Sequence, residues 1–234
     1  MELNTGEKKS NNYRYERKFY ISGLLPQEVE ALIKLHPAIF SEIYYRRYVN
    51  NIYFDSIGWH NYFDNMDGAA DRKKIRIRWY GRLLGHIDKP VLERKSKKGI
   101  LGKKESYLLH PFEIGKDPDA AVVAETIGAP GVPGRIKWEF TSLVPTMMNR
   151  FGRKYFLSAD GHFRITLDTD LSFYPLGRRN NTFLHRFTDD IHVILELKYE
   201  QDMDNHADAV TTAFPFRLTR SSKYVSGLER LYAW

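Results

Sequence analysis

Strict alternation of polar and apolar side chains marks the stretch Lys74–Tyr80 as a β-strand. Cationic side chains occupy positions 74, 76 and 78, and isoleucine or tryptophan occupies the positions between them. Successive side chains of a strand point to opposite faces of the sheet. The pattern therefore predicts a strand with one basic face, carrying Arg76 and Arg78, and one apolar face.

The same alternation recurs in segments far apart in the chain. Further strands are predicted at 13–21, 44–55, 91–95, 105–109, 163–168 and 191–199, with a strand–turn–strand at 143–157. Several of them place ionic groups two residues apart, so that each pair shares one face. These pairs are Glu16 and Lys18, Glu93 and Lys95, Arg164 and Asp168, and Glu196 and Lys198.

Helices are predicted between and after the strands. Pro26 suits the first turn of a helix that ends before Pro37, and further helices are predicted at 59–65, 117–127, 208–213 and 221–232. In the last of these, Val225, Leu228 and Leu231 form an apolar stripe. The Pro/Gly-containing segment 128–134 is short enough to be an internal loop. The pattern indicates an α+β fold dominated by antiparallel strands.

Two architectures fit these charged faces. One is a sandwich with an apolar core and a charged exterior, and the other is a closed antiparallel barrel with an ionic interior and helices outside. Arginine and glutamate dominate the charged faces, where a solvent face would also carry serine, threonine and asparagine. Amphipathic helices also need a sheet surface to cover. Both features favour the barrel, but charge content alone leaves the two alternatives open.

The bulk composition favours an anionic partner. The chain has 234 residues, a net charge of +7 and a pI of about 9.4, and it contains no cysteine. Disulfides and thiolate metal sites are therefore excluded. Residues 1–12 are predicted to be a disordered polar tail without the apolar region of a signal peptide, and residues 13–234 a single domain. No apolar run is long enough for a membrane span, so a soluble, cytoplasmic protein is expected.

Eight motifs then occur in order along the chain: YERKF (15–19), NIYFD (51–55), KIRIRWYG (74–81), LERK (92–95), NR (149–150), RITLD (164–168), LELK (195–198) and SKY (222–224). Together they resemble the VTC domain, the catalytic domain of the vacuolar transporter chaperone polyphosphate polymerase, within the triphosphate tunnel metalloenzymes. The resemblance extends from Tyr13 to Lys223. It implies a closed antiparallel β-barrel tunnel with an ionic lumen, covered by helices.

The resemblance also implies an activity and a set of site residues. Members of this type transfer the γ-phosphate of ATP onto a polyphosphate chain with Mn²⁺ or a similar divalent ion such as Mg²⁺. The phosphate ligands implied by resemblance are Lys18, Arg76, Arg78, Lys95, Arg150, Arg164, Lys198 and Lys223, with Lys104, Arg220 and Ser222 less firmly placed. Glu196 is the implied metal ligand, with Glu16 and Glu93 as additional candidates.

One position departs from the wider superfamily pattern, which opens with Glu-x-Glu-x-Lys. Here Arg14 stands in place of the first acid, which favours the VTC branch over a two-metal triphosphatase. The phosphate-sensing and membrane segments of the eukaryotic VTC proteins have no counterpart in this chain. Any coupling to transport would therefore need a separate, membrane-associated partner protein.

Simpler roles and other functions compete with this interpretation. Glu196 could simply form an ion pair with a neighbouring cation instead of binding a metal. Asp168 could pair with an arginine, and Ser222 could be a plain helix cap. A triphosphatase and a non-catalytic polyanion binder are the alternative functions. Nucleic acid is not expected as the partner, because Trp79 lies opposite the arginines of its strand rather than beside them. No Walker loop, GxGxxG motif or paired-histidine metal motif is present.

Overall fold

The computed structural model describes residues 14–98, 101–115, 125–176 and 186–232. Its strands are β1 (Arg14–Ile21), β2 (Ser41–Asp55), β3 (Asp71–Tyr80), β4 (Gly85–Ile87), β5 (Val91–Lys98), β6 (Leu101–Leu108), β7 (Phe112–Ile114), β8 (Val144–Leu157), β9 (Arg164–Pro175), β10 (Phe187–Asp189) and β11 (Val193–Glu200). Its helices are α1 (Pro26–Lys34), α2 (His60–Met66), α4 (Gly134–Phe140), α5 (Asp204–Thr212) and α6 (Lys223–Tyr232), with the 3₁₀ turn η1 (Gln201–Met203).

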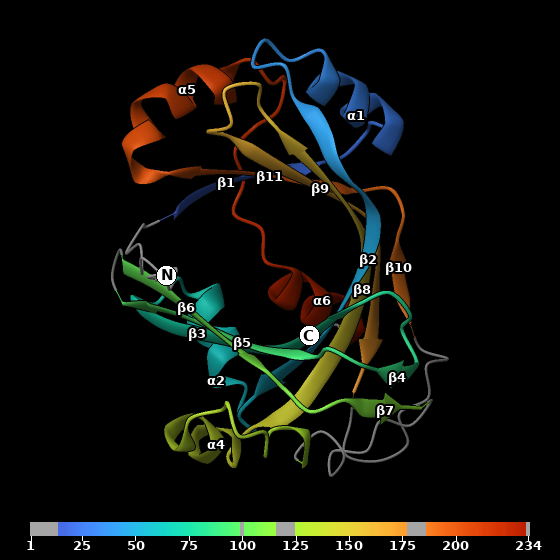
Figure 1. Ribbon diagram of the computed structural model, residues 1–234, viewed down its shortest axis with the longest axis vertical. Helices are drawn as coiled ribbons and strands as arrows, with labels where there is room; N and C mark the ends of the chain where they lie inside the picture. Colours follow the sequence, from blue (N-terminus) through green and yellow to red (C-terminus); the bar gives the residue numbers. More distant parts are fainter. Residues whose placement is uncertain (1–13, 99–100, 116–124, 177–185, 233–234) are drawn as a thin grey trace, which may run out of the picture.

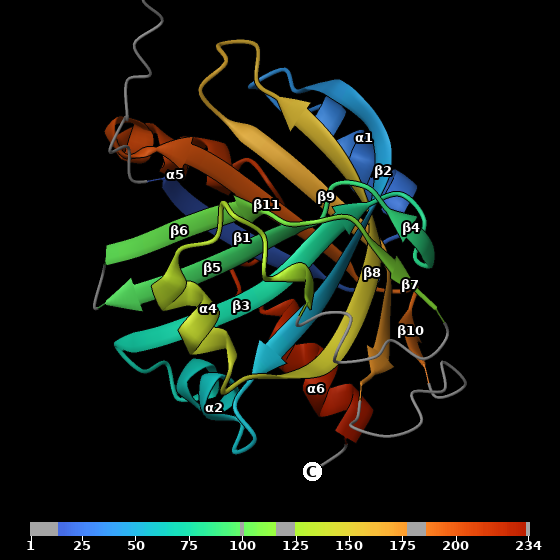
Figure 2. The ribbon, with the colours of Figure 1, turned by 60° about the horizontal axis from the view of Figure 1, so that its bottom comes forward.

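One antiparallel sheet organises the molecule. Its hydrogen-bonded order is β1-β11-β9-β8-β2-β3-β5-β6, with β10 added to β9, while β4 and β7 form a separate pair. The sheet curls, so that β1, β11 and β9 face β3, β5 and β6, and the long strands β2 and β8 join the two halves (Figures 1 and 2). The curl gives the sheet an inner face and an outer face.

Apolar side chains on the outer face form two cores under helices and loops. In one half, Ile75, Ile77 and Trp79 of β3 are buried in a cluster that includes residues of α4 and of the β4–β7 pair. In the other half, Phe19 of β1 and Leu195 of β11 are buried in a cluster with residues of α1 and α5. The apolar parity of each alternating strand therefore lies outward, beneath covering elements.

The C-terminal helix α6 lies against the inner face of the sheet, between its two halves (Figure 1). Its buried residues Tyr224 and Leu228 share a third core cluster with residues of β2, β8 and β9. The Tyr224 ring stacks on that of Tyr53, with 5.1 Å between the ring centroids. This packing leaves the first turn of α6 facing the polar part of the inner face.

The structure confirms the α+β class and most predicted elements, with several differences. Residues 144–157 form the single strand β8 rather than a strand–turn–strand, and this strand pairs with both β2 and β9 on either side of Arg150. Helix α4 and the short strands β4, β7 and β10 were not predicted. The predicted tail at 1–12 lies outside the described residues, as does most of the helix predicted at 117–127.

Closure of the sheet into a barrel was also predicted. Within the described residues, the hydrogen-bonded path ends at β1 on one side and at β6 on the other, so the ladder is open between these strands. One ion pair spans this gap, because Glu16 Oε2 on β1 lies 3.9 Å from Lys95 Nζ on β5. The two halves of the inner face are therefore near each other where the ladder is open.

Candidate functional site

The inner face carries a dense set of ionisable side chains, here called the ionic face. Alternation along each strand places them on the same face of the sheet, because within each strand they are separated by two residues or a multiple of two. The ionic face comprises Glu16 and Lys18 of β1, Lys74, Arg76 and Arg78 of β3, Glu93 and Lys95 of β5, Lys104 of β6, Arg153 of β8, Asp168 of β9, Glu196 and Lys198 of β11, and Lys223 of α6.

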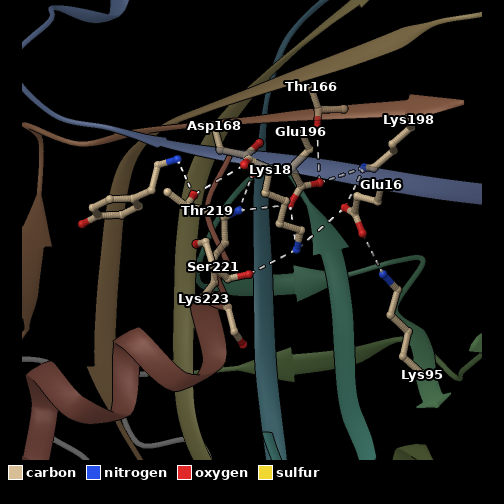
Figure 3. Close-up of polar contacts among 12 residues, drawn as sticks. Glu16, Lys18, Lys95, Thr166, Asp168, Glu196, Lys198, Thr219, Ser221 and Lys223 are labelled. Carbon is tan, nitrogen blue, oxygen red and sulfur yellow. Dashed lines mark hydrogen bonds and ion pairs between the residues drawn. The ribbon is translucent and has the colours of Figure 1, made fainter. Parts of the chain in front are cut away.

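Glu196 is a carboxylate near which four of these cations lie, among them Lys18, Lys198 and Lys223 (Figure 3). Its oxygens lie 2.9 Å from Lys198 Nζ, 3.6 Å from Lys18 Nζ, and 3.7 Å from both Lys223 Nζ and Arg153 Nη2. Burial alone would raise its pKa. The surrounding positive charges, Lys198 first, nevertheless hold the pKa of Glu196 well below its usual range.

Asp168 is fully buried beside Glu196 and is paired on two sides. Arg153 donates from Nε and Nη2 to the two carboxylate oxygens at 2.5 and 2.6 Å, and Lys223 Nζ lies 2.5 Å from Oδ2. The fork of a guanidinium matches the two oxygens of a carboxylate, which fixes the orientation of both groups. Although burial opposes it, these cations lower the pKa of Asp168.

Glu93 organises the opposite half of the ionic face. Arg76 Nε donates to it at 2.8 Å, Lys104 Nζ lies at 2.6 Å, and Arg78 Nη1 lies at 3.5 Å. Neither arginine points to bulk solvent, because their side chains are only 18% and 11% exposed. Against the effect of burial, the two arginines and Lys104 lower the pKa of Glu93.

Glu16 connects the two halves. Its Oε1 lies 3.8 Å from both Lys18 Nζ and Lys198 Nζ, and its Oε2 lies 3.9 Å from Lys95 Nζ. Figure 3 shows this carboxylate between the lysines of β1 and β11 and the lysine of β5. Lys18 and Lys198 thus contact both Glu16 and Glu196, which places the two carboxylates near each other.

Glu16 and Glu196 could hold a divalent metal ion only together with oxygens of a bound ligand. Among the residues that the structure describes, no three histidine, aspartate or glutamate side chains gather to form a metal site. Mg²⁺ in phosphate-transfer sites is commonly held by one or two carboxylates together with phosphate oxygens. Glu196 and Glu16 fit that arrangement. Glu93 does not fit it, because Arg76 and Lys104 bind its two oxygens at 2.6 Å, whereas among the described cations of the ionic face only Lys198 comes as close as 2.9 Å to Glu196.

The remaining predicted residues are not all brought together. Arg164 is exposed at the start of β9, with Lys198 as its register partner on β11, and Arg220 is exposed in the segment before α6. Ser222 accepts a hydrogen bond from Lys74 Nζ at 2.9 Å and one from the backbone N–H of Val225 at 3.4 Å. It therefore contacts the ionic face and also resembles a helix cap.

Arg150 is misplaced by the sequence interpretation. It lies on the face of β8 opposite Asn149, whose Oδ1 accepts from Asn51 on the inner face, and its guanidinium stacks 3.9 Å from the ring centroid of Tyr48. The arginine that β8 contributes to the ionic face is Arg153. Alternation along β8 places Arg153 on the same face as Asn149 and Phe151, whose ring lies against Lys223, and Arg150 on the opposite face, so the parity of the strand itself separates the two arginines.

Helix α6 is fixed by contacts that hold Lys223 in place. The Tyr224 hydroxyl donates to Asp55 Oδ2 at 2.5 Å, and Asp55 also accepts from the backbone N–H groups of Asn61 and Tyr62 at the start of α2. A Cβ at Gly227 would lie 2.5 Å from the Phe173 ring, so only glycine allows the helix this close to the sheet. The cation at the start of α6 is thus held by packing along the helix.

Three residues of the ionic face were absent from the predicted site. Arg153 and Asp168 stood in strands that the sequence identified, and Asp168 was read as a partner for an arginine, which the structure confirms. Lys74 shares the parity of Arg76 and Arg78, and that parity was the signal that could have added it to the site.

No helix in the described part of the chain is long and apolar enough to cross a membrane.

Comparisons with solved structures show that other proteins share this fold. The chain shares its fold with a protein of Pyrococcus horikoshii (TM-score 0.53, 13% identity, covering 92% of this chain and 99% of that one). It also resembles a "putative adenylate cyclase" of Vibrio parahaemolyticus (0.50, 13%, 92% and 97%) and another of Bacillus halodurans (0.51, 13%, 93% and 96%). A comparison with curated protein sequences finds no match.

The sequence itself matches the family described as the VTC domain over residues 13–232, nearly the whole chain. The family expected from the eight ordered motifs is thereby confirmed, and the chain belongs to the VTC domain family.

Proposed function

We propose that this domain is a metal-dependent polyphosphate polymerase that transfers the γ-phosphate of a nucleoside triphosphate onto a polyphosphate chain. One observation carries the proposal: among the residues that the structure describes, the nine cations of the ionic face meet four carboxylates, Glu16, Glu93, Asp168 and Glu196. When all are ionised, five positive charges are left over. A linear phosphate chain carries negative charge along its length and is an anion of the right kind to balance them.

The chemistry of phosphoryl transfer suits such a surface. Catalysis of this reaction is almost entirely positioning and electrostatic stabilisation, with little covalent work for side chains. Arginine binds phosphate oxygens through two parallel hydrogen bonds, and lysine acts as a point charge. Arg76 and Arg78 are positioned by Glu93, and Lys223 and Arg153 by Asp168. The carboxylates would then orient the cations, and the cations would bind and align the phosphates.

A divalent ion would be held by Glu196 and Glu16 together with oxygens of the substrate. When bound, it would neutralise charge on the phosphates and orient them, as it does in other phosphoryl-transfer enzymes. Glu93 is assigned to positioning its arginines instead, because each of its two oxygens is bound by a cation at 2.6 Å. Lys18 and Lys198 each contact both proposed ligands.

The test is incubation of the purified protein with ATP and Mn²⁺ or Mg²⁺. Polyphosphate is read on a stained gel, phosphate by a colorimetric assay, and the nucleotide product by chromatography. We expect polymer and ADP from the wild type and neither from Glu196→Gln. The matched control is Glu113→Gln, a glutamate of β7 that pairs only with His86 on an exposed surface.

Each other product indicates a different function. Phosphate without polymer would make the domain a triphosphatase. A cyclic nucleotide would extend to this chain the activity named for two of its structural neighbours. Retained binding of polyphosphate without any product would indicate a polyanion-binding module. Loss of activity in both glutamate variants would point to damage to the fold, which thermal unfolding of the variants would reveal.

A further inference from the structure

Lys74 is the cation of the ionic face that has no acidic partner. It lies on β3 with its Nζ 2.9 Å from the Ser222 hydroxyl, at the start of α6. Among the residues that the structure describes, no carboxylate forms an ion pair with it, whereas Arg76 on the same strand pairs with Glu93. Ser222 is neutral and cannot offset the charge of an ammonium group.

The surroundings of Lys74 are strongly positive. The charged groups near it are Lys18 of β1, Lys95 of β5, and Arg72 and Arg76 of its own strand, and α6 contributes the neutral hydroxyl of Ser222. Burial, followed by the charges of Lys18 and Lys95, lowers the pKa of Lys74 to about 7. Several partly buried cations with one neutral partner are an unfavourable arrangement unless an anion joins them.

The neighbour in sequence shows what an ordinary lysine of this strand does. Lys73 points to the outer face, is 47% exposed, and forms an ion pair of 2.8 Å with Glu139 of α4. Lys74 therefore differs from Lys73 in the face of the sheet on which it lies, in the charges that surround it and in the group that it contacts. A role limited to stability would be better served by an acid beside Lys74 than by four further cations.

We propose that Lys74 is a phosphate-binding residue, and that a phosphate group of a linear polyphosphate binds where Lys18, Lys74, Lys95 and the Ser222 hydroxyl converge. This inference rests on the proposed function and adds to it a subsite on β3 and α6. Lys74 donates to the phosphate oxygens in its charged form. The hydroxyl of Ser222 keeps the ammonium oriented when the phosphate is absent.

Binding at this subsite takes up a proton near neutral pH. An anion beside Lys74 favours the charged lysine and raises its pKa again. At pH 8 the free lysine is mostly neutral, and the bound lysine is charged. The complex therefore gains up to about one proton as the anion binds.

The experiment measures binding of inorganic tripolyphosphate without metal by isothermal titration calorimetry at pH 8, in buffers of different ionisation enthalpy. Wild type, Lys74→Met, Lys74→Arg and the matched control Lys73→Met are compared. Loss of one charge-assisted contact should weaken the affinity of Lys74→Met by about ten- to a hundred-fold. The other two variants should stay close to the wild-type affinity. Proton uptake should fall in both Lys74→Met and Lys74→Arg, because neither methionine nor arginine takes up a proton at pH 8.

The outcomes separate this inference from the proposed function. Wild-type affinity and proton uptake in Lys74→Met would overturn the role of Lys74 and leave the polymerase proposal intact. Equal weakening in Lys73→Met would also overturn it, since a general loss of surface charge would then explain the effect. If wild type itself bound no tripolyphosphate, both proposals would fail. Melting temperatures of the two methionine variants show whether each one is folded.

Discussion

Lys223 Nζ lies 2.5 Å from Asp168 Oδ2, and this ion pair ties the first turn of α6 to the sheet. The carboxylate is fully buried, and the lysine is 9% exposed. A cation in the first turn of a helix opposes the helix dipole, so the position needs a compensating negative charge. Asp168 supplies it from within the sheet, and Arg153 holds Asp168 on its other side.

Replacing Asp168 with asparagine should be strongly destabilising. The change leaves Arg153 and Lys223 buried with only the more distant Glu196 as a carboxylate partner, at 3.7 Å from each. Breaking a buried ion pair by removing one member costs roughly 3–5 kcal/mol, and Glu196 should keep the loss near the lower end of that range. Urea unfolding measures the free energy of unfolding.

The control is Asp170→Asn on the same strand. Asp170 pairs with Arg46 at an exposed position, with side chains 49% and 34% accessible. Exposed pairs contribute about 0–1 kcal/mol, so this variant should unfold nearly as the wild type does. Equal losses in both variants would show that the buried pair has no special importance.

Conservative replacement of Arg153 should reduce turnover much more than the same change at Arg150. Arg153→Lys keeps the charge but loses the two-pronged contact with Asp168. We expect at least a roughly tenfold loss of kcat/KM, or about 1.4 kcal/mol of transition-state stabilisation. Arg150→Lys, on the other face of β8, should stay within about twofold of wild type by the same measure.

The opposite ranking would restore the sequence-based assignment of Arg150 and contradict the geometry. Initial rates with ATP and Mn²⁺ decide between them, with polyphosphate as the product. Arg150 also stacks on Tyr48, so a change in melting temperature without a change in rate is compatible with its position.

Strands with and without a register shift show where sequence reasoning succeeds and where it stops. Alternation in β3 placed Arg76 and Arg78 on one face correctly, because the strand keeps an unbroken register with β2 and β5. The register shift beside Arg150 falls in β9, where the step from Ser172 to Thr169 pairs with the shorter step from Arg150 to Gly152, and it changes the face that each parity of β9 presents. A bulge depends on the partner strand, so the chain's own periodicity cannot reveal it.

The cations that pair with each acid could not be predicted from the sequence either. Glu93 and Glu196 were both recognised as acids among bases, but only the fold decides which cations reach them. Glu93 is surrounded by Arg76, Arg78 and Lys104, whereas Glu196 lies next to Glu16 through shared lysines. Local spacing sets the face of each side chain, and the order of strands in the sheet sets its neighbours.

His36 should make stability depend on pH below about 6.5. Its Nε2 bonds to the Val210 carbonyl, its Nδ1 accepts from the Ala38 N–H, and burial lowers its pKa. The unfolded state therefore binds a proton at a higher pH than the folded state does. Stability is full above the unfolded pKa of about 6.5 and declines as pH falls, by up to about 1.4 kcal/mol per pH unit.

Chemical unfolding at a series of pH values tests this, with His36→Gln as the variant and His206→Gln as the control. Removal of the buried histidine should flatten the profile in this window. His206 is exposed on α5, so its replacement should leave the slope unchanged. A slope that persists in His36→Gln would assign the effect to other groups.

Gly227→Ala should lower both stability and activity. An added Cβ would lie 2.5 Å from the Phe173 ring and 2.7 Å from the Met147 side chain, so α6 must move away from the sheet. Alanine is the better helix former by about 1 kcal/mol, but overpacking costs about 1–3 kcal/mol. Because methionine can yield and the ring cannot easily do so, we expect net destabilisation.

The activity should fall further than the loss of stability explains, since α6 carries Lys223 to Asp168 and Glu196. Initial rates measured well below the melting temperature separate the two effects, because the variant is then fully folded. Glu229→Ala, an exposed position on the same helix, is the control for helix propensity alone. Wild-type rates in folded Gly227→Ala would mean that the placement of Lys223 tolerates movement of the helix.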